Sequence, residues 1–439
     1  MGDRMVRVEL IHTGTELLTG ARLNVHAQWL SQRLSSLGYG VSRQVAVADE
    51  AGAIRAAVAE ALGRVPLVLV TGGLGPTSDD RTREEIAGLL GLGLKLDERV
   101  LKRLESFYAA RGRPMPERAR VQALVPAGAV VLENRWGTAP GLAIEVSEEL
   151  RWAWGRGKAG TFSEGSGWLI MLPGPARELH PMFEEEVMPL LARVMPVEEE
   201  WASVTLRTVG LPESQVEREV AGVLEGVAPG VELGTCVHFG QVDVRLSARG
   251  PGAHARIREA EAAVVGLLGG AVFGRGGELL EAVVLRMLRE RGATLAVAES
   301  CTGGCLAHRL TNVPGASEVF WGGWITYSNE AKVKSLGVDA SDLAAHGAVS
   351  EPVARQMAEG ARRAAGSTYA LAITGIAGPT GGTAEKPVGT VFVACAGPEG
   401  TEVVRRFHPG DRLTFKEVTA TFALDLLRRV LMERGKPVT

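Results

Sequence analysis

The chain has 439 residues, of which 46% are hydrophobic and 23% are charged, and its formal net charge is −3. This length suggests about three domains, and the hydrophobic content is ample for a core in each of them. The small net charge gives no indication of a nucleic-acid or anionic-membrane partner.

The start of the chain and its cysteines indicate a protein of the cytoplasm. Residues 1–6 lack the apolar core of a signal peptide, and the longest apolar stretch, residues 262–273, is too short and glycine-rich to span a bilayer. Four cysteines in so long a chain are no disulfide framework. We therefore expect a reduced, cytoplasmic protein with no membrane partner.

The first part of the chain alternates strands with helices. Apolar runs predict strands over 6–11, 41–47 and 67–70. Helical spacing and end signals predict helices over 24–38 and 51–62. This alternation is typical of a doubly wound parallel sheet, which binds its ligands at the carboxyl ends of the strands.

A glycine-rich loop, residues 71–80, follows the third strand at that end of the predicted sheet. Its glycines are Gly72, Gly73 and Gly75. Glycines let backbone N–H groups approach a phosphate, and a helix from Thr82 would present its positive end to the same group. The loop therefore predicts a phosphate-binding site.

Two adjacent carboxylates, Asp79 and Asp80, end this loop, and Glu16 and Asp49 follow the first and second strands. The fold brings all four acids to one edge of the sheet. Paired carboxylates beside a phosphate site are typical of a divalent metal such as Mg²⁺. The alternative is that one aspartate caps the helix from Thr82 while the other is solvated.

Four blocks in this part resemble the CinA (competence/damage-inducible) family. They are Gly14-Thr15-Glu16-Leu17-Leu18-x-Gly20, Gly72-Gly73-Leu74-Gly75-Pro76-Thr77-x-Asp79-Asp80, Gly137-Thr138-Ala139-Pro140-Gly141 and Leu172-Pro173-Gly174-Pro175. The resemblance implies a molybdopterin-binding-like domain that hydrolyses ADP-ribose to AMP and ribose 5-phosphate with Mg²⁺ or Co²⁺. A pterin or nucleotide sensor without turnover is the alternative.

The same resemblance implies which residues form the N-terminal site. Those expected to bind nucleotide are Gly14, Glu16, Asn24, Gly72, Gly73, Gly75, Thr77, Pro140 and Gly141, and the metal ligands are Asp49, Asp79 and Asp80. The family usually shows Asn-x-Asn-Ala near Asn24, whereas this chain has His26 at the third position.

A short acidic run, residues 198–200, predicts a linker before a smaller domain. Strands over 203–209, 231–237 and 242–248 and helices over 213–224 and 253–268 give a β-α-β-β-α order, which resembles a KH-type module. An RNA-binding KH module needs a G-x-x-G clamp, but the match at 266–269 is apolar and ends a helix. We therefore expect a spacer or a homodimer contact; a DNA-repair or competence adaptor is the alternative function.

Glycines at 269–270 and 274–277 predict a second linker, after which a third domain begins. The apolar run 294–298 reads as a buried strand, and residues 305–310 read as a helix. Ser300 lies in the turn between them, where the N–H groups of the helix could stabilise an oxyanion. The turn therefore suits a nucleophile, although Ser300 or Thr302 could instead merely cap the helix.

A serine nucleophile needs a base, and the candidates are His308, His346 and Lys332. A lysine at the end of a strand, in a pocket of Trp321, Trp324 and Tyr327, could be desolvated enough to stay partly neutral near pH 7. An ordinary solvated lysine is the alternative. A thiolate at Cys301 is the rival nucleophile, because helix N-termini activate thiolates.

Five further blocks resemble the CinA C-terminal domain. They are Ala298-Glu299-Ser300-Cys301-Thr302-Gly303-Gly304, Tyr327-Ser328-Asn329-Glu330-Ala331-Lys332, Gly347-Ala348-Val349-Ser350, Thr374-Gly375-Ile376-Ala377-Gly378-Pro379 and Lys386-Pro387-Val388-Gly389-Thr390. That domain is similar to nicotinamide mononucleotide amidohydrolases, which are Ser/Lys hydrolases. The resemblance implies a Ser300–Lys332 dyad without a metal.

The remaining roles in the third domain complete the predicted site. We expect Tyr327 to orient Lys332, and Arg412 to bind the substrate phosphate. The other expected oxyanion and substrate residues are Thr302, Gly303, Gly304, Thr374, Gly375, Ala377 and Gly378. The expected partners are therefore small nucleotides, namely nicotinamide mononucleotide and ADP-ribose.

The predicted fold class is α/β. An N-terminal doubly wound sheet of molybdopterin-binding type and a C-terminal amidohydrolase domain are joined by a small α+β KH-like domain. The expected domain ranges are 1–196, 200–270 and 275–439.

Overall fold

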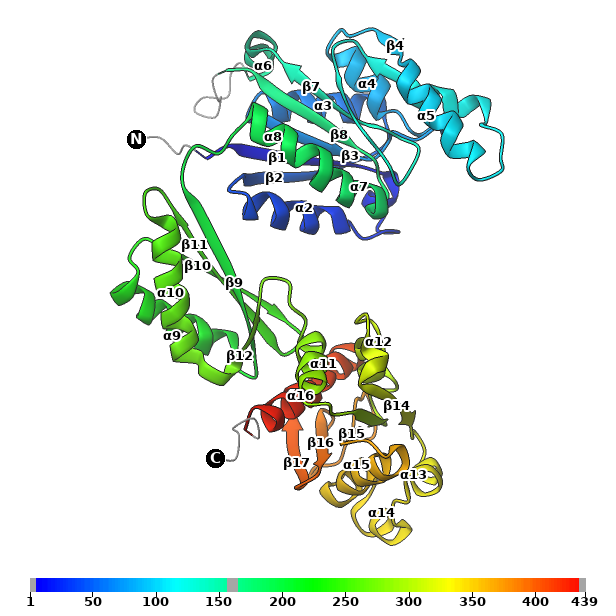
Figure 1. Ribbon diagram of the computed structural model, residues 1–439, viewed down its shortest axis with the longest axis vertical. Coiled ribbons are helices and arrows are strands. Elements are labelled where there is room, and N and C mark those ends of the chain that lie inside the picture. Colours follow the sequence, from blue (N-terminus) through cyan, green and yellow to red (C-terminus); the bar gives the residue numbers. More distant parts are fainter. Residues whose placement is uncertain (1–4, 156–164, 434–439) are drawn as a thin grey trace. The chain divides into compact units, whose positions relative to one another are not determined.

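The computed structural model describes residues 5–155 and 165–433 of the chain (Figure 1). The chain divides into two compact units, Met1–Ala202 and Ser203–Thr439. The first holds one α/β domain, and the second holds the small KH-like domain followed by another α/β domain. The predicted α/β class is confirmed.

The first unit is built on a six-stranded sheet with the order β2-β1-β3-β8-β7-β6. Its strands are β1 (Arg7–Thr13), β2 (Gly40–Val47), β3 (Leu67–Thr71), β6 (Val130–Leu132), β7 (Gly141–Val146) and β8 (Gly167–Leu172). The first four strands in this order are parallel, and β7 and β6 run antiparallel. Because β1 lies between β2 and β3, the loops after β1 and β3 flank a topological switch point.

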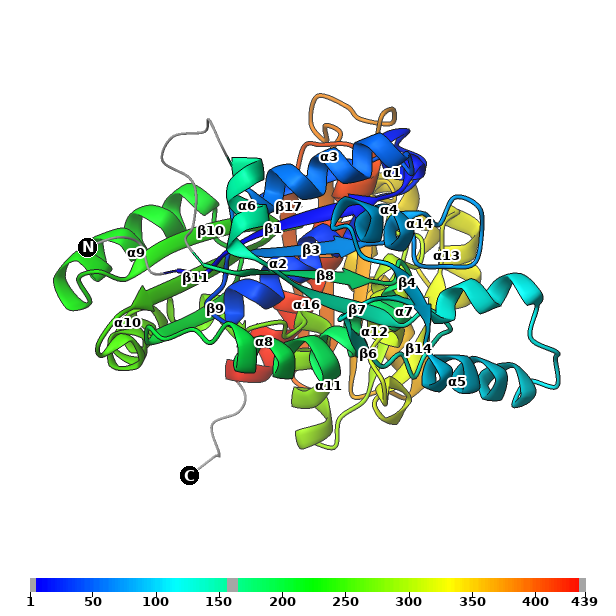
Figure 2. The same ribbon diagram turned by 90° about the horizontal axis from the view of Figure 1, so that it is seen from above.

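Helices cover both faces of this sheet (Figures 1 and 2). One face holds α3 (Ala51–Leu62), α4 (Thr82–Leu89) and α5 (Glu98–Ala109), and the other holds α2 (Val25–Ser36), α7 (Ala176–Met182) and α8 (Met188–Val194). Val68 and Val70 of β3 pack on the first face, while Leu67 and Leu69 pack on the second. Burial on both faces explains why this strand is an unbroken apolar run.

The remaining elements of the first unit are short. They are α1 (Thr15–Leu18), β4 (Leu94–Leu96), β5 (Leu124–Pro126), α6 (Glu148–Gly155), the 3₁₀ helix Glu117–Ala123 and the π-helical turn Phe183–Val187. The predicted linker at 198–200 has no regular structure.

The KH-like domain is a four-stranded sheet with the order β10-β11-β9-β12 and two helices. Its elements are β9 (Trp201–Val209), α9 (Glu213–Val227), β10 (Glu232–His238), β11 (Gln241–Arg249), α10 (Ala253–Leu268), the 3₁₀ helix Gly269–Ala271 and β12 (Val272–Arg275). The predicted order of elements is confirmed, but the linker predicted at 274–277 is wrong at its start. Gly274 and Arg275 belong to β12, which pairs antiparallel with β9.

The last domain has a five-stranded sheet with the order β14-β13-β15-β16-β17. Its strands are β13 (Leu295–Glu299), β14 (Phe320–Ile325), β15 (Tyr369–Gly375), β16 (Thr390–Gly397) and β17 (Gly400–Phe407). β14, β13 and β15 are parallel, and the other two are antiparallel. The chain passes from β13 to β14 on one side and later to β15 on the other, so the turn after β13 lies at the switch point.

The two faces of this sheet are packed differently. The helices α11 (Leu280–Glu290), α12 (Cys305–Thr311) and α16 (Arg412–Glu433) cover the face that shows Leu295 and Val297. The helices α13 (Asn329–Leu336), α14 (Ala340–His346) and α15 (Glu351–Ala365) cover the face that shows Ala296 and Ala298. Small side chains on this second face let α15 approach the sheet closely.

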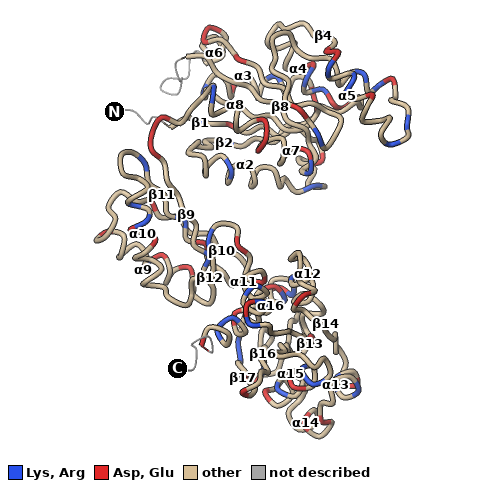
Figure 3. Tube along the Cα trace, in the orientation of Figure 1, with Lys and Arg blue, Asp and Glu red and all other residues tan. Residues whose placement is uncertain are grey.

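None of the described helices is long and apolar enough to cross a membrane. Charged residues of both signs are interspersed along the trace of each domain (Figure 3).

Two helical glycines test how tight the packing around α15 is. A Cβ on Gly360 would overlap the carbonyl oxygen of Leu336, whereas a Cβ on Gly222 in α9 would meet no atom within 4 Å. We expect Gly360→Ala to lower the free energy of unfolding of its unit by about 2 kcal/mol or more. We expect Gly222→Ala to raise it by about 0.5–1 kcal/mol, because alanine is the better helix former. Equilibrium urea unfolding measures both; equal effects of the two substitutions would contradict this packing.

Candidate active site and nucleotide cavity

Three parallel strands of the last domain end at the same edge of the sheet and carry the predicted catalytic residues there. Ser300 directly follows β13, the turn with Thr326 and Tyr327 follows β14, and the loop from Ile376 follows β15. Strand β14 ends at Ile325, and Lys332 lies on helix α13 rather than at the end of a strand, as the sequence had predicted.

Lys332 and Ser300 form a buried pair. The ammonium nitrogen Nζ lies 3.1 Å from Ser300 Oγ and 2.7 Å from the carbonyl oxygen of Thr326. The two side chains are 1% and 8% exposed. The two residues are 32 positions apart in the chain, and the parallel pairing of β13 with β14 closes that distance.

The surroundings of Lys332 disfavour its charged form. Burial lowers the pKa of Lys332 below its ordinary value of 10.5. The residue lies in the first turn of α13, where the positive end of the helix also opposes an added cation. Both of its hydrogen-bond partners are neutral. A lysine held in this way can act as a base.

The aromatic pocket predicted around Lys332 is not what buries it. Trp321 and Tyr327 are 57% and 62% exposed, and Trp321 stacks on Trp324 at 5.4 Å. Tyr327 does not hold the lysine either, since its hydroxyl accepts a hydrogen bond from Arg412 at 2.7 Å. The carbonyl oxygen of Thr326 is the group that orients Lys332.

Glu299 caps helix α12, so neither Ser300 nor Thr302 has the capping role that was the alternative to the predicted nucleophile and oxyanion turn. Its carboxylate accepts hydrogen bonds from the backbone N–H groups of Gly304, Leu306 and Ala307 at 2.8–3.1 Å. Helix N-termini favour carboxylates, so an acid directly before the predicted turn was the signal for this role. With the cap supplied by Glu299, the Ser300 hydroxyl is left to Lys332.

This cap changes the expected oxyanion site. The N–H of Gly304 is bound by Glu299, and the N–H of Gly303 donates to the carbonyl oxygen of Ser300 at 3.1 Å. Neither N–H is therefore free for an oxyanion in this structure. Within the described ranges, the N–H groups of Cys301 and Thr302 donate to no other protein group. These two amides, rather than the glycine amides, are therefore the candidate oxyanion donors of this turn.

Cys301 lacks the properties of a reactive thiolate. Its side chain is 5% exposed, and burial raises the pKa of the thiol to about 12. Reactive cysteines have a lowered pKa and are accessible, so the structure does not favour Cys301 as the nucleophile.

The loop after β15 is held to its neighbours by backbone and side-chain contacts. Thr374 Oγ1 donates to the carbonyl oxygen of Ala348 at 2.8 Å, and Arg412 donates to that of Gly378 at 2.9 Å. The methyl group of Ala377 belongs to the hydrophobic core, so only its backbone can face a substrate. Gly375 ends β15, and a Cβ there would contact β16.

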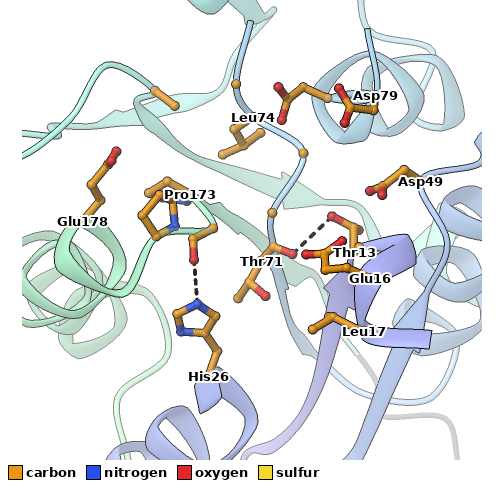
Figure 4. Close-up of a pocket in the computed structure, with 18 of the residues that line it drawn as sticks. Thr13, Glu16, Leu17, His26, Asp49, Thr71, Leu74, Asp79, Pro173 and Glu178 are labelled. Carbon is orange, nitrogen blue, oxygen red and sulfur yellow. Dashed lines mark hydrogen bonds between the residues drawn. The ribbon is translucent and has the colours of Figure 1, made fainter. Parts of the chain in front are cut away.

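The first unit has a cavity of about 500 Å³ at the carboxyl ends of its parallel strands. In Figure 4, Glu16, Asp49 and Asp79 lie on one side of the cavity and Glu178 on the other, with Thr71, Leu74 and Pro173 between them. A volume of this size suits a nucleotide-sized ligand. The predicted residues that line it are Gly14, Glu16, Asn24, Asp49, Gly72, Gly73, Gly75, Asp79 and Asp80.

Three predicted nucleotide-binding residues are not among the lining residues, namely Thr77, Pro140 and Gly141. Thr77 donates its N–H and its hydroxyl to Asp80 instead. Gly141 begins β7, where a Cβ would contact Met182.

The sequence interpretation gave no role to Gln122 and Glu178, which are buried and line the cavity. Of these two residues, only Glu178 lies near a block that carries the family resemblance, since it follows the Leu172–Pro175 block by three residues.

Two of the glycines predicted to bind nucleotide use their backbone N–H groups for hydrogen bonds within the fold. The N–H of Gly72 donates to the carbonyl oxygen of Leu172, and the N–H of Gly14 donates to that of Val47. In the described part of the chain, the N–H groups of residues 73–75 have no protein acceptor. Backbone donors for an anion are therefore concentrated after Gly72.

His26, which stands where the family usually has asparagine, lines the cavity, and its side chain is hydrogen-bonded to a backbone group. Its Nε2 lies 2.6 Å from the carbonyl oxygen of Gly174, so this nitrogen carries the proton. His26 interacts electrostatically with a second histidine, His12, which is 1% exposed and hydrogen-bonded to Thr71 Oγ1 at 2.8 Å. Burial, with a contribution from His26, lowers the pKa of His12 to about 4.

Comparison with known proteins identifies the family. Family profiles match residues 277–431 ("CinA C-terminal domain"), 9–193 ("Probable molybdopterin binding domain") and 203–274 ("Damage-inducible protein CinA KH domain"). A CinA-like protein of Anaeromyxobacter sp. (strain Fw109-5) is 44% identical over 427 residues, which cover 97% of this chain and 99% of that protein. The chain belongs to the CinA family.

Two further CinA relatives are similar to this chain. A CinA-like protein of Akkermansia muciniphila is 43% identical over 437 residues, covering 99% of this chain and 100% of that protein. The crystal structure of the competence/damage inducible protein CihA from Agrobacterium tumefaciens covers 34% of this chain and 93% of its own, with 39% identity and a TM-score of 0.33.

His12 makes the stability of the first unit depend on pH. The folded-state pKa of about 4 lies below the unfolded value of 6.5, so the unfolded chain binds the proton more readily. The stabilisation is complete above pH 6.5 and is lost as the pH falls toward 4. From pH 7 to pH 5 we expect His12 to account for a loss of about 2 kcal/mol. Hydrogen exchange of β1 and β3 in urea measures the stability of this unit alone.

Two variants test whether the loss of stability between pH 7 and pH 5 comes from protonation of His12. His12→Asn should lose less stability than the wild type between the two pH values, whatever its starting stability. Thr71→Val removes the hydrogen-bond partner but keeps the titrating ring, so it should retain the wild-type slope. A slope unchanged in His12→Asn would contradict the assignment to His12.

Proposed function

We propose that the C-terminal domain is a Ser/Lys amidohydrolase that converts nicotinamide mononucleotide to nicotinic acid mononucleotide and ammonia. The observation that carries this proposal is the buried Lys332 Nζ at 3.1 Å from Ser300 Oγ, with only neutral partners. A neutral lysine at hydrogen-bond distance can take the hydroxyl proton. The resemblance of the surrounding blocks to nicotinamide mononucleotide amidohydrolases supports the choice of substrate.

The proposed reaction uses Lys332, Ser300 and the backbone N–H groups in the following steps. The neutral amine of Lys332 takes the proton of Ser300, whose Oγ attacks the carboxamide carbon of the nicotinamide ring. The N–H groups of Cys301 and Thr302 stabilise the oxyanion. The C–N bond then breaks, and the nitrogen leaves as ammonia with the proton that Lys332 returns. Water, deprotonated by the same lysine, hydrolyses the resulting ester and releases the product and the serine.

The dyad predicts which substitutions remove the amidase activity. We expect Ser300→Ala and Lys332→Ala each to lower kcat by at least about 1,000-fold, because one loses the nucleophile and the other its base. Cys301→Ala should stay within about threefold of the wild type. Ammonia release from nicotinamide mononucleotide measures all three.

The rival nucleophile and the pH profile provide the controls. Near-normal turnover by Ser300→Ala together with loss in Cys301→Ala would contradict the proposal. Because only the neutral amine is active, kcat/KM of the wild type should rise with pH up to the lowered pKa of Lys332.

We infer that the cavity of the first unit hydrolyses ADP-ribose to AMP and ribose 5-phosphate with a divalent metal. The cavity of about 500 Å³ with carboxylates at one end and free backbone N–H groups beside them supports this second activity. A pyrophosphate is the part of ADP-ribose that needs both kinds of group.

The residues of the cavity fit a metal that is held jointly with phosphate oxygens. In residues 5–155 and 165–433, no group of three or more His, Cys, Asp or Glu side chains is arranged to hold a metal ion. Mg²⁺ usually binds one or two carboxylates, several waters and phosphate oxygens rather than a full protein cage. Asp79 and Asp80 would provide those carboxylates, and the ion would neutralise charge on the pyrophosphate. Asp49, the third predicted ligand, accepts hydrogen bonds from the N–H and hydroxyl of Thr15 through Oδ2, as Asp80 does from those of Thr77, so it would hold the metal on the same terms as Asp80.

This assignment predicts that two carboxylates of the cavity matter and a remote one does not. We expect Asp79→Asn and Asp80→Asn each to lower AMP formation from ADP-ribose with Mg²⁺ by at least about 100-fold. Asp97→Asn, at the N-cap of α5 outside the cavity, should leave it within about twofold. AMP is measured by chromatography, and no AMP from the wild type with Mg²⁺ or Co²⁺ would favour the sensor alternative.

A further inference from the structure

Helix α16 brings a second cation, Lys416, to the turn that holds Ser300. A Cβ placed on Gly303 would lie 3.7 Å from Lys416 Nζ. Gly303 is three residues after Ser300 in the same turn. Arg412 lies one helical turn before Lys416, and residues four apart lie on the same face of a helix. The two cations therefore share the side of α16 that faces the predicted active site.

Arg412 is held in place without being neutralised. Its two terminal nitrogens donate to the carbonyl oxygen of Gly378 at 2.9 Å and to the Tyr327 hydroxyl at 2.7 Å. Both partners are uncharged. Within the described ranges, neither Arg412 nor Lys416 forms an ion pair. A guanidinium fixed by neutral acceptors keeps its full charge and free N–H donors for an anion.

The carboxylates near these cations are already bound to other groups. Asp411 accepts hydrogen bonds from the N–H groups of Leu413 and Thr414 at the start of α16. Glu417 lies 3.8 Å from Arg309, and Glu299 caps α12. Among the described residues, none of these three acids forms an ion pair with Lys416, which is half-buried. An unpaired and partly desolvated cation beside a nucleophile favours an anionic substrate.

We propose that Lys416 binds the phosphate monoester of the substrate beside Arg412, the phosphate ligand already expected from the sequence, and that Lys416 makes the site select a nucleotide over the nucleoside. This inference rests on the proposed amidase function. Arg412 offers a planar fork for two phosphate oxygens, and Lys416 adds a compact charge from the next helical turn.

The test compares the nucleotide with its nucleoside. We expect Lys416→Met to raise KM for nicotinamide mononucleotide about 10- to 100-fold, because a charge-assisted hydrogen bond to phosphate is lost. Its kcat should stay within about threefold, and kcat/KM for nicotinamide riboside should not change. Lys416→Arg should restore most of the affinity. Lys334→Met is the matched control, since Lys334 is exposed and paired with Glu330.

A binding measurement separates failure of this inference from failure of the proposed function. Calorimetry on Ser300→Ala, with and without Lys416→Met, measures the Kd of nicotinamide mononucleotide without turnover, and inorganic phosphate serves as a competing probe. If the wild type releases ammonia but Lys416→Met changes neither KM nor Kd, the subsite is wrong and the function stands. If no ammonia is released but Lys416→Met weakens the binding of both nicotinamide mononucleotide and inorganic phosphate, the subsite stands and the function is wrong. A KM that rises equally for the riboside would also overturn the subsite.

Discussion

The C-terminal site depends on an amine buried against neutral partners. Lys332 is 1% exposed, and its nitrogen contacts only Ser300 Oγ and the carbonyl oxygen of Thr326. A carboxylate at that position would favour the charged form of the lysine, which cannot accept a proton. The fold therefore has to bury the lysine without an acid nearby, which the short turn between β14 and α13 achieves. The acid that does lie next to Ser300, Glu299, is occupied by three N–H groups of α12.

Charge is arranged in opposite ways at the two sites. At the C-terminal site the free charges are positive, because the surrounding acids cap helices or pair with other residues. In the cavity of the first unit, the charged side chains of the lining are mostly carboxylates. The first arrangement can bind a phosphate directly, whereas the second needs a cation between the protein and the phosphate. Two nucleotide sites in one chain would thus recognise phosphate by different physical means.

Several parts of the fold could be predicted because their signals are local. Helix α3 begins and ends at the predicted residues 51 and 62, and α10 at the predicted 253 and 268. Helix α13 and strand β12 were missed. The former is a short polar helix whose stability comes from packing against α15, and the latter is a glycine-containing strand that forms only by pairing with β9. Both elements form because they pack against or pair with segments that are distant in the sequence.

The sequence alone determined which residue types are available at the sites. It also determined that strands and helices alternate, and this alternation brings the loops to one edge of each sheet. That edge is why Ser300, the turn after β14 and the loop after β15 could be expected together. Only the tertiary structure decided what each side chain binds. It assigned the helix cap to Glu299, the lysine to the carbonyl oxygen of Thr326, and the Tyr327 hydroxyl to Arg412. Hydrogen bonds are directional and short, so they depend on side-chain positions that spacing along a chain does not specify.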